Sequence, residues 1–349
     1  MWRRVHDIVW GAAHVERGRI TWRAPLRAAI VTSLVCGLAI GLSDDPLAIP
    51  ITLGALFTGV SDMVEAPGQR VRSMLWTSCW VAVGGTIGGL VSDDLVLRII
   101  VIGLIGAICG YAGTLGRLGT LVGILTLVVT TIATGVPEST VSALQWGALL
   151  LVGGLVQTAV VVVPDLIRRR RELLTAPPAK PSIATRLREH LHGDDPLFRH
   201  AIRLGVAMPV AAILAEMTGW PHAYWIPLTV AWLSRPNAEG FGSRVLARVL
   251  GTVAGIGISV FLIDVLGLKQ FGFALLVGVG AYLVVAFVNA NYTIAVIGIT
   301  GVIMALFTLI GDPVAETAIA RIVATLVGSL IVIIAPLIYP PPKRSMTPA

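Results

Sequence analysis

Charged residues are scarce in this sequence. Asp, Glu, Lys and Arg make up 13% of its 349 residues, whereas a soluble globular domain carries roughly 25%. Hydrophobic residues reach 56% and fall in long runs rather than on alternating faces. This distribution excludes an ordinary soluble domain. It is typical of helices surrounded by lipid, where backbone groups must be hydrogen-bonded within the helix itself.

Motifs for catalysis and metal binding are also missing. Cys36, Cys79 and Cys109 lie in apolar stretches without CxxC spacing, which predicts small packing residues rather than a redox site. His190 and His192 have no cysteine or carboxylate placed to complete a metal site. No glycine-rich loop ends in Lys-Ser or Lys-Thr, and no Ser/His/Asp set stands out. The sequence therefore predicts no enzyme activity, no cofactor, no metal and no ATP-driven pump.

Twelve apolar segments follow one another along the chain, and we interpret each as a helix in the membrane. The second and eighth are shorter than the roughly 20 residues that a spanning helix needs. The segments are residues 26–42, 46–60, 73–91, 95–112, 118–134, 142–163, 200–219, 223–234, 249–264, 271–288, 292–310 and 318–339.

Basic residues are distributed unevenly between these segments. With the N-terminus in the cytosol, all but three of the 26 Lys and Arg residues fall in cytosolic segments or at cytosolic helix ends. The exceptions are Arg98, Lys269 and Arg321. The positive charge is therefore an orientation signal that places both termini in the cytosol. Its expected partner is the anionic lipid of the inner leaflet, not nucleic acid.

The two halves of the chain resemble each other. Residues 49–52 and 226–229 both read Ile-Pro, an aliphatic residue and Thr, and Arg27 matches Arg203 at nearly the same offset. Since each half holds six segments, the pattern predicts a parallel repeat. The predicted fold is an all-α polytopic membrane protein with about twelve transmembrane helices in two parallel six-helix repeats. The predicted regions are an amphipathic arm at 1–24, the first repeat at 25–164, a cytosolic linker at 165–199, the second repeat at 200–340 and a tail at 341–349.

Paired short segments with a proline are typical of the central site of a transporter. We expect Pro50 and Pro227 to remove a backbone N–H and to kink their helices. An alternative is that both segments are kinked packing helices without a substrate. The side chains predicted to line the site are Thr52 in the first copy and Tyr224, Trp225, Thr229 and Trp232 in the second.

Arginines follow the short segments on the predicted cytosolic side. Arg72 follows the first segment, and Arg244 and Arg248 follow the second. A guanidinium group can bond both oxygens of a carboxylate, so these residues are candidates for binding an anionic substrate. The alternative is that they serve only to orient the protein.

Few ionisable residues lie inside the apolar segments. Glu216 is the only acid well inside a predicted helix, and desolvation there would favour its protonated form, which predicts a proton-coupling role. Alternatively, Glu216 reaches the nearby membrane surface, as we expect for Arg98 and Arg321.

Glycines spaced four residues apart recur in these segments and predict close helix packing. The clearest pairs are Gly37/Gly41, Gly84/Gly88, Gly85/Gly89, Gly106/Gly110, Gly119/Gly123 and Gly251/Gly255.

The second half resembles a known family. YWIPLTVAWLSRP at 224–236 and SRVLARVLGTVAGIG at 243–257 are similar to signature stretches of the fusaric acid resistance (FUSC) and aromatic acid exporter family. LFRHAIRLGVA at 197–207 and NYTIAVIGITGVIM at 291–304 extend the resemblance. It implies a bacterial inner-membrane or plasma-membrane exporter of aromatic carboxylates or related organic anions, driven by the proton motive force. Plant malate channels are similar at a greater distance.

Long members of that family carry a large cytosolic domain between their membrane blocks, whereas the linker here has about 35 residues. A periplasmic adaptor, which some relatives use, therefore does not follow from the resemblance. The predicted function is export of organic anions. The alternatives are a passive organic-anion channel and a non-transporting scaffold or assembly subunit. The oligomeric state stays open, a homo-oligomer included.

Overall fold

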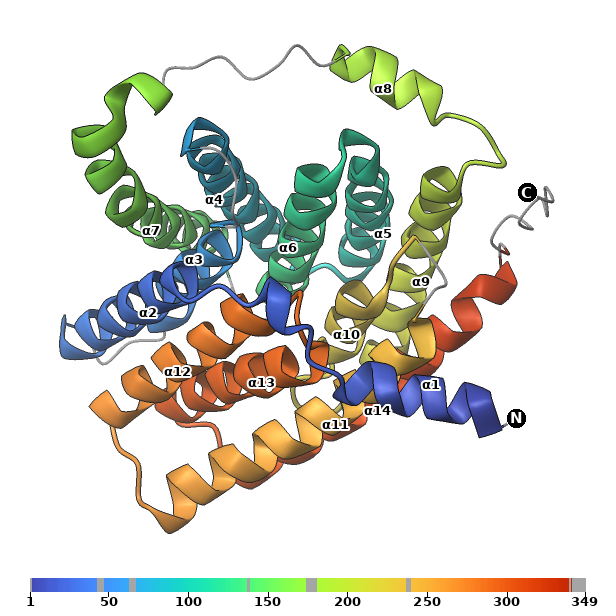
Figure 1. Cartoon of the computed structure of the whole chain (residues 1–349). Coiled ribbons are helices and arrows are strands. Elements are labelled where there is room, and N and C mark those ends of the chain that lie inside the picture. Colours follow the sequence, from blue (N-terminus) through green and yellow to red (C-terminus); the bar gives the residue numbers. More distant parts are fainter. Residues whose placement is uncertain are drawn as a thin grey trace.

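A computed structural model gives the architecture of the chain (Figure 1). It describes residues 2–42, 47–62, 67–136, 139–173, 181–236, 240–338 and 340. The regular elements of this described part are all helical, which confirms the all-α prediction.

The helices of the first half are α2 (Arg23–Leu42), α3 (Ala48–Val60), α4 (Pro67–Leu90), α5 (Leu95–Tyr111), α6 (Arg117–Ala133) and α7 (Thr140–Leu173). Those of the second half are α9 (Pro196–Thr218), α10 (Trp225–Leu233), α11 (Phe241–Val260), α12 (Phe271–Phe287), α13 (Tyr292–Leu309) and α14 (Val314–Ile338). The shorter elements are α1 (Trp2–Ala13), α8 (Ile183–Glu189), two 3-10 turns at Arg17–Arg19 and Ala112–Leu115, and a π-helical turn at Phe261–Val265.

Each apolar segment predicted from the sequence overlaps one of the helices α2–α7 or α9–α14. Within the described residues, seven helices are long and apolar enough to cross a membrane. Helices α3, α6 and α12 are apolar but shorter, and α10 has only nine residues. The structure therefore supports a multi-pass membrane protein, while twelve spanning helices remain a prediction.

Large apolar side chains cover the outer surface of the bundle. On α2 the exposed ones recur every four residues, at Leu26, Ile30, Leu34, Leu38 and Leu42. On α5 the same spacing recurs at Val96, Ile100, Leu104 and Ile108. Apolar stripes of this extent are unfavourable in water, so they identify the surface that faces lipid.

The helices pack in the same order within the two halves. In the first half α4 packs against α6 and α7, and α3 packs against α2 and α7. In the second half α11 packs against α13 and α14, and α10 packs against α9 and α14. Between the halves, α5 lies along α9 and α12 lies along α2 (Figure 1). The fourth helix of each half therefore packs against the first helix of the other half.

Glycines make these close contacts sterically feasible. A Cβ added to Gly106 would lie 3.2 Å from the carbonyl oxygen of Leu204 on α9. A Cβ added to Gly251 on α11 would lie 2.6 Å from the carbonyl oxygen of Thr293 on α13. The prediction of close packing is confirmed at Gly251, where a Cβ would clash with the facing backbone, and at Gly106, where the neighbouring helix leaves little room. At Gly41 the prediction is wrong, because a Cβ there would meet nothing within 4 Å.

Polar contacts fix the ends of several helices. Asp62, after α3, has a fully buried side chain whose Oδ2 accepts hydrogen bonds from Nη2 of Arg27 at 2.6 Å and from its Nε at 3.1 Å. Nε of Arg70 lies 3.5 Å from the other oxygen. At the start of α13, Nδ2 of Asn291 donates to the last backbone carbonyls of α1 and to that of His14 at 2.9 Å. These contacts join α2, α3 and α4, and fasten the N-terminal arm.

The prolines of the two short helices do not kink them, contrary to the prediction. Pro50 is the third residue of α3 and Pro227 is the third residue of α10. The first four N–H groups of a helix have no intrahelical acceptor, so a proline in this turn removes no helical hydrogen bond. Both prolines therefore mark where the short helices begin.

Candidate anion-binding site

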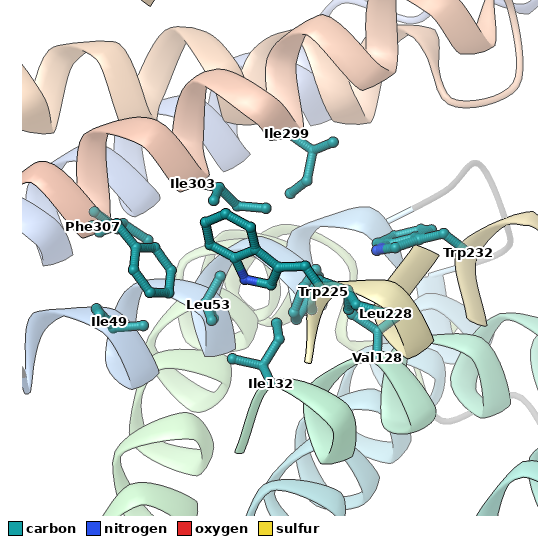
Figure 2. Close-up of a pocket in the computed structure, with 12 residues that line it drawn as sticks. Ile49, Leu53, Val128, Ile132, Trp225, Leu228, Trp232, Ile299, Ile303 and Phe307 are labelled. Carbon is teal, nitrogen blue, oxygen red and sulfur yellow. The ribbon is translucent and has the colours of Figure 1, made fainter. Parts of the chain in front are cut away.

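A narrow apolar cavity lies where the short helices of the two halves meet, and we call it the neck. Its walls come from α3 and α6 in the first half and from α10 and α13 in the second (Figure 2). The volume of the neck is about 20 Å³, close to the minimum for one water molecule, and an apolar wall offers that water no partner. The structure therefore describes a closed conformation. The lining residues drawn with labels are Ile49, Leu53, Val128, Ile132, Trp225, Leu228, Trp232, Ile299, Ile303 and Phe307.

Trp225 lines the neck and is part of a group of packed aromatic rings. Its indole stacks on the imidazole of His222, with 4.6 Å between the ring centroids, and meets the ring of Phe307 edge-on at 5.2 Å. His222 Nε2 in turn lies 3.2 Å from Asp312 Oδ2, between α13 and α14. The aromatic side chains are therefore held in place by contacts between the α9–α10 and α13–α14 turns.

Arg321, on α14, packs against these aromatic side chains. Its guanidinium carbon is 5.3 Å from the centroid of the Trp225 ring, which permits a cation–π interaction. The side chain is fully buried, and Nε and both Nη atoms have no hydrogen-bond partner. The prediction that Arg321 reaches the membrane surface is wrong, because the face of α14 that carries it is packed against α10 and α11.

Arg248 is the second fully buried arginine, and it comes from α11. Its Nε and one Nη atom have no hydrogen-bond partner. One turn earlier, the guanidinium carbon of Arg244 lies 4.3 Å from the centroid of the Tyr292 ring. Tyr292 is close enough to Arg248 to interact with it electrostatically as well.

Arg248 and Arg321 together form what we call the arginine pair. The two cations are near enough to repel each other. Within the described parts of the chain, neither forms an ion pair with a carboxylate. Burying an unpaired charge costs several kcal/mol, and an intramembrane charge of this kind is a functional-site hypothesis by default. A bound anion would supply the missing charge and the missing hydrogen-bond acceptors, so the pair is suited to hold a carboxylate.

The structure brings part of the predicted site together. Trp225 and Trp232 line the neck, and the buried hydroxyl of Tyr224 lies close enough to Arg321 to interact with it electrostatically. Arg248 is buried deeper than the sequence indicated, while Arg244 is partly buried against Tyr292.

Other predicted residues lie apart from the arginine pair. Arg72 is exposed on α4. Thr52 is fully buried next to Cys36 of α2. Thr229 packs against Gly328, and its hydroxyl donates to the carbonyl of Trp225 at 2.9 Å. A contact between these three residues and a substrate stays a prediction that nothing in this geometry favours.

Glu216 lies on the surface of the bundle rather than in its interior. Half of its side chain is exposed, and one carboxylate oxygen accepts a hydrogen bond from the guanidinium of Arg98 on α5. The pair joins α5 to α9 at their ends. A proton-coupling role for Glu216 remains a prediction, and it would act away from the arginine pair.

Sequence reasoning missed Arg321 and Tyr292 as site residues, although one signal was present for Arg321. Small residues at helical spacing share its face of α14, namely Thr317, Ala324 and Gly328. A face of small residues predicts close packing against another helix. An arginine on that face is buried, however near it lies to the helix end.

These observations define the class of the molecule as an all-helical, multi-pass membrane protein. Residues 210–335, which include Trp225, Arg248, Tyr292 and Arg321, match the family model described as "Fusaric acid resistance protein-like". This part of the chain is therefore similar to that family.

Several curated relatives are similar to part of this chain. The "Inner membrane protein YccS" of Escherichia coli (strain K12) is 33% identical over 146 residues, which are 42% of this chain and 20% of that protein. A Haemophilus influenzae protein is 28% identical over 142 residues, 41% of this chain and 20% of the relative. A Synechocystis protein is 30% identical over 151 residues, with 42% and 19% covered. The alignments thus cover about a fifth of the length of these relatives. No solved structure matches the chain.

Proposed function

We propose that this protein is an inner-membrane transporter that exports organic anions, with aromatic carboxylates as its substrate class and the proton motive force as its energy source. The observation that carries the proposal is the arginine pair. Arg248 and Arg321 are fully buried and retain N–H groups without acceptors. A carboxylate fits both the charge and the geometry of these groups.

The aromatic preference rests on the neighbours of the pair. Trp225 and Phe307 place aromatic rings next to Arg321, so a ring carried by the substrate would lie among aromatic side chains beside the guanidinium that holds its carboxylate. Energy coupling and direction of transport rest on the family resemblance alone. The membrane potential, negative inside, favours the outward movement of an anion.

The closed neck requires a conformational change for transport. Its walls come from both halves, and the recurring packing order supports a two-repeat arrangement with the site between the repeats. Relative movement of the two halves would widen the neck and expose the arginine pair to one side at a time. Cytosolic termini and a cytosolic linker belong to the same proposal.

A passive organic-anion channel is the second candidate. It is favoured by the position of Glu216, which lies on the surface next to Arg98 and not at the arginine pair. A channel requires the anion-binding arginines but no titratable group coupled to them.

Counterflow in proteoliposomes tests the proposal. Vesicles holding the purified protein are loaded with an unlabelled aromatic acid such as benzoate, and uptake of the labelled acid is followed. A carrier gives transient accumulation above equilibrium, whereas a channel gives equilibration without an overshoot. A primary amine of similar size serves as the control for charge. Fluxes no faster than in empty vesicles for every organic acid tested would refute both candidates.

A further inference from the structure

A second cavity lies at the end of the bundle where the linker joins α9. It is enclosed by the first turns of α9, the segment after α10 and the last turns of α14, and its volume is about 150 Å³. Its polar lining is His200, Arg203, Ser234 and Arg235, and its apolar lining includes Leu204, Ala207 and Val332. We call it the inner cavity.

The size of the inner cavity fits one ring. An engineered apolar protein cavity of about 150 Å³ is large enough to bind benzene. Leu204, Ala207 and Val332 offer such a ring an apolar wall. The apolar neck beyond it, at about 20 Å³, cannot hold a ring in this conformation.

The charge of the inner cavity fits a carboxylate. Arg203 is buried, and its Nη2 donates to the carbonyl of Pro236 at 3.3 Å, which fixes the side chain at the wall. Arg235 comes from the segment after α10 and is close enough to Arg244 for the two charges to repel. None of the lining residues described is acidic. An anion between the arginines would relieve repulsion among these cations.

We propose that the inner cavity is a loading site that binds a single-ring carboxylate before it reaches the arginine pair. Arg203 and Arg235 hold the carboxylate, and the ring lies against Leu204 and Ala207. Arg235 interacts electrostatically with Arg244 and Tyr292, and Tyr292 interacts with Arg248. These side chains therefore connect the inner cavity to the arginine pair. This assignment rests on the proposed function for its role, although binding itself requires no transport.

Equilibrium binding of labelled benzoate to the purified full chain in detergent tests the site. Arg235→Gln should weaken binding at least about tenfold, the loss expected when one charge-assisted hydrogen bond is removed. Ala207→Leu keeps every charge but fills part of the cavity, and it should weaken benzoate more than acetate. Arg188→Gln, on the exposed face of α8, is the matched control and should bind as the wild type does.

Arg321→Gln separates this site from the transport site. Arg321→Gln should lose counterflow but keep a benzoate site, and adding Arg235→Gln to it should weaken the remaining binding at least about tenfold. Wild-type affinity in both Arg235→Gln and Ala207→Leu would overturn the loading site whatever the transport result. Binding that falls in those variants, with no counterflow in the wild type, would keep the site and refute the proposed transport.

Discussion

Arg321 brings a positive charge into the interior of α14 without a hydrogen-bond acceptor. Arg248 does the same on α11. The sequence placed Arg248 among the anion-binding candidates because it follows a short helix, and the structure buries it. Arg321 was expected to reach the membrane surface because it lies near the end of a predicted helix. The sequence indicates how far along its helix a residue lies, but the direction of its side chain relative to a neighbouring helix depends on tertiary packing.

An unpaired buried charge should lower the free energy of unfolding. We expect Arg321→Met to raise the unfolding free energy by about 1–4 kcal/mol, the range seen when buried charged groups are replaced by apolar ones. The same variant should lose transport, as is common for residues kept for function. Thermal unfolding of the purified protein in detergent measures the change. A large loss of stability would show that Arg321 has a structural partner.

Asp195 makes the start of α9 sensitive to pH. Its Oδ1 accepts hydrogen bonds from the N–H groups of Leu197 at 2.8 Å and Phe198 at 3.2 Å, and its Oδ2 lies 2.7 Å from Nδ1 of His190. Burial acts to raise the pKa of Asp195, but these hydrogen bonds and the nearby His190 outweigh it and lower the pKa below its ordinary value.

The sign of this shift sets a prediction. A lowered pKa gives stabilisation that is complete above the unfolded-state pKa and is lost as the pH falls through the folded-state value. The difference in melting temperature between wild type and Asp195→Asn should therefore shrink as the pH falls below about 5, where an unfolded-state Asp begins to bind a proton. Asn keeps the capping oxygen, so the comparison isolates the charge. A difference independent of pH would contradict this account.

At the scale of elements, the sequence predicts where each helix lies along the chain but not the residue at which it begins. Long apolar runs predicted where α2–α7 and α9–α14 lie, because hydrophobicity along the chain is a strong local signal. The effect of Pro50 and Pro227 was mispredicted because the exact helix start decides whether a proline removes a hydrogen bond. A shift of a few residues turned an expected kink into an ordinary first turn.

Two glycines on α11 test the packing of elements directly. A Cβ on Gly251 would meet the backbone of α13 at 2.6 Å, whereas a Cβ on Gly257 would meet nothing within 4 Å. Gly251→Ala should destabilise the protein by about 1–3 kcal/mol through overpacking. Gly257→Ala should be neutral or stabilise by up to about 1 kcal/mol, because alanine favours helix. Equal melting temperatures for the two variants would count against the α11–α13 contact.

The whole molecule combines two halves with a similar packing order but different chemistry. In the first half, buried Asp62 forms ion pairs with Arg27 and Arg70. In the second half, Arg248 and Arg321 have no such partner within the described residues. The sequence showed this asymmetry only as a difference in aromatic content, since the pairing of charges depends on contacts distant in sequence.

Orientation is a property of the whole chain and can be measured by labelling. In a Cys79→Ser background, Lys269→Cys in the α11–α12 turn should react with a membrane-impermeant maleimide in intact cells. His192→Cys in the linker should react only after the membrane is opened. Both sites are exposed in the structure. The opposite pattern would reverse the topology and place the inner cavity on the outer side.

The central claim is that the buried arginine pair binds the transported anion, and counterflow in the arginine variants tests it most directly. Arg248→Gln and Arg321→Gln should each reduce labelled benzoate counterflow at least about tenfold, with normal insertion and abundance. Arg248→Lys keeps the charge but cannot bond both carboxylate oxygens at once, so it should weaken the apparent affinity for benzoate more than the maximal rate of transport. Arg188→Gln should transport as the wild type does. Wild-type counterflow in both Gln variants would show that the pair serves another purpose and that the anion binds elsewhere.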